Sequence, residues 1–192
     1  MNDAHSIKWL CRPDRLRFER IAWADCPRFI RKAFSRWKAL YEFAGDHALS
    51  FVFDDRWLFR VCPRQGRKHG PVCDLASIPW WLPPMLVSRN TMQNHLDLGA
   101  LVHDLLHLGC VRFPGVRRRR EQARLADAVM LALWRDCLGE DAGWWQRTRL
   151  TRKWVGVRAA APFLFRPQNN PMPDWITITD LETETTPEID HD

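Results

Sequence analysis

The chain has 192 residues, 46% of them hydrophobic and 27% charged, with a formal net charge of +6 at pH 7. This length and composition are typical of one globular domain with a substantial core, and they leave little room for a second domain. No apolar run reaches membrane-spanning length, the first residues lack a signal-peptide pattern, and the six cysteines form no C-x-x-C pair, so we expect a cytoplasmic protein.

The charge is distributed unevenly along the chain. Residues 166–192 contain one arginine and seven acidic residues, a net charge of −6, so residues 1–165 carry +12. A basic body attracts polyanions such as nucleic acid, anionic lipid headgroups or acidic protein surfaces. Its own acidic tail is an equally good partner, because no nucleic-acid-reading motif accompanies the charge.

The first half of the chain predicts one helix and one hairpin. Aromatic and aliphatic residues at helical spacing predict an amphipathic helix over residues 27–44. Residues 50–62 alternate as in a β-hairpin that turns at Asp54 and Asp55. A loop over residues 64–71 follows, and residues 73–84 begin extended and end in prolines that exclude regular structure.

The second half predicts three helices, over residues 91–109, 118–138 and 142–160. Residues 175–179 are expected to add a strand at a sheet edge, and the remainder of the acidic tail has the composition of a disordered segment. We therefore expect an α+β fold, with a small antiparallel sheet packed on a helical core that contains an antiparallel helix hairpin.

Three segments are expected in chain order. Residues 1–48 form a basic, aromatic and partly helical N-terminal segment, and residues 49–162 form the α+β core domain. Residues 163–192 form a proline-rich and acidic tail that is partly disordered.

Asp127 lies where a carboxylate is unexpected. On a helix over residues 118–138, it falls among Ala123, Met130 and Trp134 on one apolar face. An unpaired carboxylate there costs several kcal/mol or loses its charge. The preceding helix offers His103 as a partner, since a short loop makes the two helices antiparallel. A buried pair of this kind is either structural or a catalytic dyad in which His103 activates water.

A metal site is the second interpretation of the same helix. His103, Asp104 and His107 lie on one side of it, and two histidines four residues apart are a common ligand pair. Asp104 or Asp127 would supply a third ligand to zinc or calcium. His107 can equally contact carbonyl groups at the end of its helix, and Gly99 is expected to clear space for a group that approaches His103.

Two further groups of residues are weaker candidates. Asp74 and Ser77 lie in a turn that either supports the His103 site or caps its own backbone. Four consecutive arginines lie at the start of a predicted helix, where positive charge is unfavourable. A bound anion would offset this repulsion; alternatively, the four side chains are simply exposed to solvent. These are Arg117, Arg118, Arg119 and Arg120.

Four short motifs in a fixed order resemble those of an uncharacterised family encoded by tailed phages and prophages. They are D-L-A-S-I-P at 74–79, A-L-V-H-D-L-L at 100–106, R-L-A-D at 124–127 and V-G-V-R at 155–158. Members carry D-L-A-S-[IV]-P, then H-D-x-L-[YH], then A-D in a second helix, and the resemblance covers about residues 50–160. It implies a phage protein that acts in the host cytoplasm or is incorporated into the virion, and other phage structural proteins as partners.

The order of His103, Asp104 and Asp127 also resembles the active site of secreted phospholipase A2, where H-D is followed by an Asp on the next antiparallel helix. That likeness implies His103 as base, Asp104 as a cation ligand and Asp127 as the residue that orients His103. The glycine-rich calcium loop of those enzymes is missing here, and His107 stands where an aromatic residue is usual, which favours a transition metal.

These patterns predict two alternative functions. The first is a His103–Asp127 hydrolase that acts on an ester or an amide, with or without a metal ion. The second is a non-enzymatic phage virion protein, of the tail for example, in which the same pair stabilises the fold.

Overall fold

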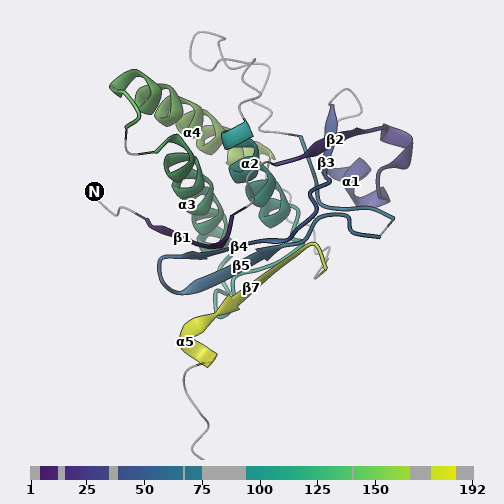
Figure 1. Ribbon diagram of the computed structural model, residues 1–192, viewed down its shortest axis with the longest axis horizontal. Coiled ribbons are helices and arrows are strands. Elements are labelled where there is room, and N and C mark those ends of the chain that lie inside the picture. Colours follow the sequence, from purple (N-terminus) through teal and green to yellow (C-terminus); the bar gives the residue numbers. More distant parts are fainter. Residues whose placement is uncertain are drawn as a thin grey trace, which may run out of the picture.

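The computed structural model contains two small antiparallel sheets and a group of helices, which confirms the α+β class (Figure 1). It describes the following residues: 5–12, 16–34, 39–66, 68–74, 94–139, 141–164 and 174–184.

The predicted hairpin forms the centre of the first sheet. Strands β4 (Leu49–Phe53) and β5 (Trp57–Val61) pair antiparallel, with Phe53 opposite Trp57. The backbones of Asp54 and Asp55 both have a φ of 52°. Two successive residues with positive φ match the right-handed twist of the flanking strands, and aspartate accepts this conformation more readily than most residues do.

Strands from both ends of the chain complete this sheet, in the order β1-β4-β5-β7. β1 (Ile7–Cys11) pairs with β4, and β7 (Ile176–Asp180) pairs with β5 at the opposite edge. The predicted edge strand near residues 175–179 is thus confirmed. Strand pairing crosses both of the predicted domain boundaries, so the two outer segments contribute to the same sheet as the core.

The second sheet corrects one prediction. It contains β2 (Phe18–Ile21), β3 (Leu40–Phe43) and β6 (Val72–Cys73), with β3 in the middle. The predicted helix over residues 27–44 is wrong: α1 (Arg28–Ala33) is short, and it follows a single 3-10 turn, η1 (Trp23–Asp25). The apolar spacing fits a helix, but the backbone of β3 finds partners in two strands that are distant in the sequence.

The three long helices lie close to their predicted ranges. They are α2 (Asn94–His107), α3 (Arg119–Leu138) and α4 (Trp144–Leu164), and a one-turn α5 (Leu181–Glu184) follows β7. α2 and α3 lie side by side as the expected hairpin, on one side of the first sheet (Figure 1). None of the described helices is long and apolar enough to cross a membrane.

The loop between α2 and α3 attaches the hairpin to the sheet. Phe113 from this loop meets the rings of Trp57 and Phe59 edge-on, at centroid distances of 5.2 and 5.6 Å. Gln122 on α3 holds the loop, because its side-chain amide accepts from the backbone N–H of Phe113 and donates to the carbonyls of Phe113 and Val116. The position of the helices relative to the sheet is therefore fixed by both apolar and polar contacts.

Gly99 lets α2 and α3 approach closely. A Cβ atom added at Gly99 would lie 2.6 Å from the indole of Trp134 and 3.1 Å from the carbonyl oxygen of Met130. The space that we expected Gly99 to clear beside His103 is therefore taken by Trp134, a buried side chain of α3. Gly99 acts on the site indirectly, by setting the distance between the two helices.

Gly99→Ala is predicted to destabilise the protein by about 1–3 kcal/mol, because overpacking outweighs the gain of about 1 kcal/mol in helix propensity. Urea unfolding followed by circular dichroism measures the change. Gly143→Ala, just before α4, is the control for the added methyl group, since a Cβ there meets nothing within 4 Å, and it should cost less than Gly99→Ala. In a Trp134→Leu background, which is itself less stable because a cavity is left, Gly99→Ala should cost less than it does in the wild type. An equal cost in both backgrounds would contradict the close contact between Gly99 and Trp134.

Candidate functional site

Two histidines on α2 face one aspartate on α3. His103 Nε2 lies 3.1 Å from Asp127 Oδ1, and His107 Nε2 lies 3.8 Å from the same oxygen. The two imidazole rings are neighbours, with centroids 4.0 Å apart. The contact between His103 and Asp127 that the sequence predicted is therefore present, and His107 joins it from the next turn of the helix.

The spacing of these three side chains suits a metal ion. Their ligand atoms all lie within 4.8 Å of one another. Tetrahedral coordination with bonds of about 2.0 Å places ligand atoms about 3.3 Å apart, so the distances to Asp127 lie close to what one ion requires. Two imidazoles and one carboxylate are also the donor set of many catalytic zinc sites, which keep the fourth position for water or substrate.

Asp104 lies on the other side of the His103 ring. Its Oδ1 is 3.8 Å from His103 Nδ1, and its Oδ2 accepts a hydrogen bond of 3.1 Å from the backbone N–H of Asp74. A carboxylate beside the distal nitrogen of a ligating histidine orients the ring and strengthens it as a ligand. Of the two carboxylates, Asp127 thus lies where a third ligand would be needed, and Asp104 lies where it can position His103.

The cluster is largely buried. His103 is 8% exposed and Asp127 is 5% exposed, and Ala126 and Val129 beside Asp127 belong to the core. From α4, the Trp154 indole donates a hydrogen bond of 3.3 Å to the backbone carbonyl of Asp127. Three helices therefore fix the positions of the charged groups.

The protonation states follow from this environment. Burial opposes the charge on His103, but contacts with Asp104 and Asp127 outweigh it and raise the His103 pKa to about 9. Burial and the charge of His103 together hold the pKa of His107 well below 6.5. Burial, together with the charge of Asp74, raises the pKa of Asp104 to about 6. At neutral pH, the cluster therefore combines a protonated His103 with a neutral His107.

The remaining predicted residues lie apart from the cluster or reach it indirectly. Asp74 contributes its backbone N–H to Asp104, and Ser77 lies outside the described residues. The four arginines at residues 117–120 are exposed at the start of α3 and take no part in the cluster. No local pattern indicates that Trp154 supports Asp127, because this contact depends on how α4 crosses α3.

No known protein family, no curated protein and no solved structure matches this chain. The likenesses to a phage family and to phospholipase A2 therefore stay predictions, and the geometry of the cluster is the observation from which a function can be inferred.

In protein treated with a chelator, His103 and His107 should titrate at different pH values. Histidine C–H resonances followed by NMR should show His103 with a pKa of about 9, while His107 protonates only well below pH 6.5. Asp127→Asn removes a negative partner and should lower the His103 pKa, whereas His47→Ala, at an exposed position, serves to assign resonances and should leave the other titrations unchanged. A His103 pKa near 6.5 in the wild type would contradict the arrangement.

Proposed function

We propose that the protein is a metal-dependent hydrolase of an ester or amide, with His103, His107 and Asp127 as ligands of one divalent ion. The observation that carries the proposal is the convergence of these three ligand atoms within 4.8 Å, with Asp104 behind His103. A transition metal, zinc before calcium, is favoured because two of the three ligands are imidazoles, whereas calcium prefers oxygen.

The chain's own groups have distinct tasks in this proposal. His107 is neutral at pH 7 and needs no deprotonation before it binds an ion. The Asp104 carboxylate lies 3.8 Å from His103 Nδ1 and favours the proton on that nitrogen, which leaves Nε2 for the ion, and the backbone N–H of Asp74 holds Asp104. A divalent ion bound there would polarise a carbonyl group and lower the pKa of water to about 7.

The reaction is a simple hydrolysis. The oxygen of water is added to the carbonyl carbon, the bond to the alcohol or amine breaks, and the proton of water goes to that leaving group. The resemblance over residues 50–160 supports a phage- or prophage-encoded setting, in the host cytoplasm or the virion.

Burial favours a second candidate. His103 and Asp127 are each less than 10% exposed, as in pairs that only stabilise a fold. In that case the protein is a non-enzymatic phage virion or assembly protein, and its basic body binds partner proteins, nucleic acid or anionic lipid.

Metal content separates the two candidates. Protein purified without a histidine tag should contain zinc or another transition metal at about one ion per chain, measured by mass spectrometry. His107→Ala should abolish this stoichiometry, and Asp104→Asn should weaken binding by about 10- to 100-fold. His47→Ala, an exposed histidine outside the cluster, is the control and should bind metal as the wild type does.

Hydrolysis of chromogenic esters and amides by the same preparations completes the test. Activity should disappear with a chelator, return with zinc and be absent from folded His107→Ala. Metal-free wild-type protein that folds normally and takes up no ion on dialysis against zinc would support the structural role instead.

A further inference from the structure

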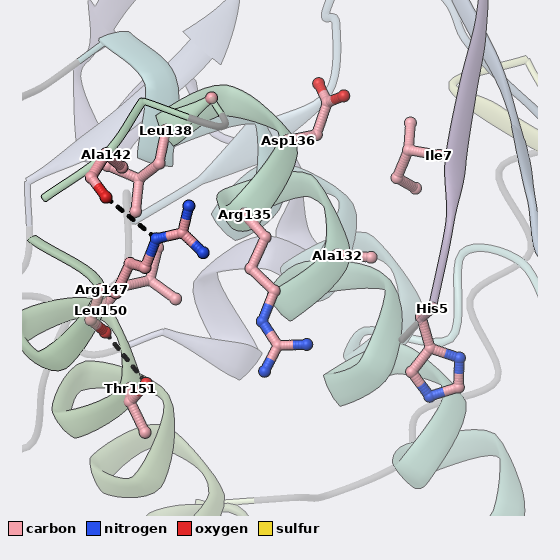
Figure 2. Close-up of a pocket in the computed structure, with 11 residues that line it drawn as sticks. His5, Ile7, Ala132, Arg135, Asp136, Leu138, Ala142, Arg147, Leu150 and Thr151 are labelled. Carbon is pink, nitrogen blue, oxygen red and sulfur yellow. Dashed lines mark hydrogen bonds between the residues drawn. The ribbon is translucent and has the colours of Figure 1, made fainter. Parts of the chain in front are cut away.

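A cavity of about 520 Å³ lies apart from the histidine–aspartate cluster, where the end of α3 and the start of α4 approach the beginning of β1 (Figure 2). Neither His103 nor His107 nor Asp127 lines it. Its size falls within the usual range for small-molecule sites, about 300–1,000 Å³. The cavity is therefore a separate candidate site from the proposed hydrolase centre.

Basic side chains converge on this cavity from three segments. Arg135 extends from α3, Arg147 from α4 and His5 from the segment before β1, and in the view of Figure 2 the guanidinium of Arg135 lies between the other two. Arg147 donates its Nε to the carbonyl of Ala142 at 2.9 Å, which holds its guanidinium at the cavity. The result is a concentration of positive and donor groups around one cavity.

The acidic residue among those that line the cavity is already engaged. Asp136 accepts a hydrogen bond of 2.7 Å from the indole of Trp9 and lies 3.6 Å from Arg12. Figure 2 shows its carboxylate directed away from Arg135. Within the part of the chain that the structure describes, Arg135 has no ion pair.

A contact through Nδ1 holds the His5 ring in place and leaves Nε2 available for a ligand. Its Nδ1 lies 2.6 Å from Asp54 Oδ2, in the turn between β4 and β5. This contact fixes the ring and sets Nε2 as the nitrogen that can meet a ligand. The turn between β4 and β5 thus supports one side of the cavity.

We propose that this cavity binds the phosphate group of a small phosphorylated molecule. A phosphate carries a charge of about −1.5 to −2 and three acceptor oxygens, enough for two guanidinium groups and an imidazole, whereas a carboxylate has two oxygens and one charge. Apolar side chains complete the wall and suit the organic part of the ligand; these are Ile7, Leu138 and Leu150. The proposal is independent of the metal site and of hydrolysis.

Isothermal titration calorimetry tests the proposal on the full chain, with inorganic phosphate and a nucleoside monophosphate as probes at constant ionic strength. Both should bind the wild type, and the nucleotide should bind more tightly because it also covers the apolar wall. Arg135→Gln should weaken binding by about 10-fold or more, through loss of charge-assisted hydrogen bonds. The affinity of Arg135→Lys should lie between those of the wild type and Arg135→Gln, because lysine keeps the positive charge but lacks the planar guanidinium.

Arg124→Gln is the matched control, since Arg124 is also exposed on α3 but does not line the cavity. It removes the same charge and should leave binding unchanged. Equal losses in Arg124→Gln and Arg135→Gln would mean non-specific attraction to the basic body and would overturn the proposal. Binding to vesicles of anionic lipid, with no heat from either soluble probe, would overturn it as well.

Discussion

The close antiparallel contact between α2 and α3 is the constraint on which the rest of the structure depends. It is possible because Gly99 has no side chain, so the buried indole of Trp134 fits against the backbone of α2. The same register sets His103 opposite Asp127. The loop that joins the helices is fixed to the first sheet through Phe113 and Gln122. Packing therefore decides where the charged groups meet.

The charges of the side chains in the histidine–aspartate cluster determine which ligand the cluster can bind. Asp104 and Asp127 flank His103 and together overcome the cost of burying its charge. A positive charge between two carboxylates is favourable whether it is a proton or a metal ion. His107 stays neutral beside it, which supplies a further nitrogen ligand without a second buried charge. These are the properties that the proposed metal site requires.

α3 links this cluster to the cavity at its far end. Asp127 lies in the cluster, and Arg135 follows about 12 Å further along the helix axis, where α4 and the start of β1 meet it. The cluster is proposed to bind a cation and the cavity an anion, and their other residues come from different segments, but both include residues of α3. A substitution that displaces α3 would therefore disturb both, whereas a change confined to one side chain should disturb one.

The amino-acid sequence determined what local patterns can specify. The turn at Asp54 and Asp55, the three long helices and the need of Asp127 for a partner could all be predicted, because each depends on residues a few positions apart or on an antiparallel neighbour. The strand at Leu40–Phe43 was mistaken for helix, since its partners β2 and β6 lie elsewhere in the chain. Only the tertiary structure decided that Trp134 fills the space at Gly99, that Asp74 supports Asp104, and that His5, Arg135 and Arg147 surround one cavity. Such contacts join distant segments, and the sequence carries no local signal of the distance or angle at which those segments pack.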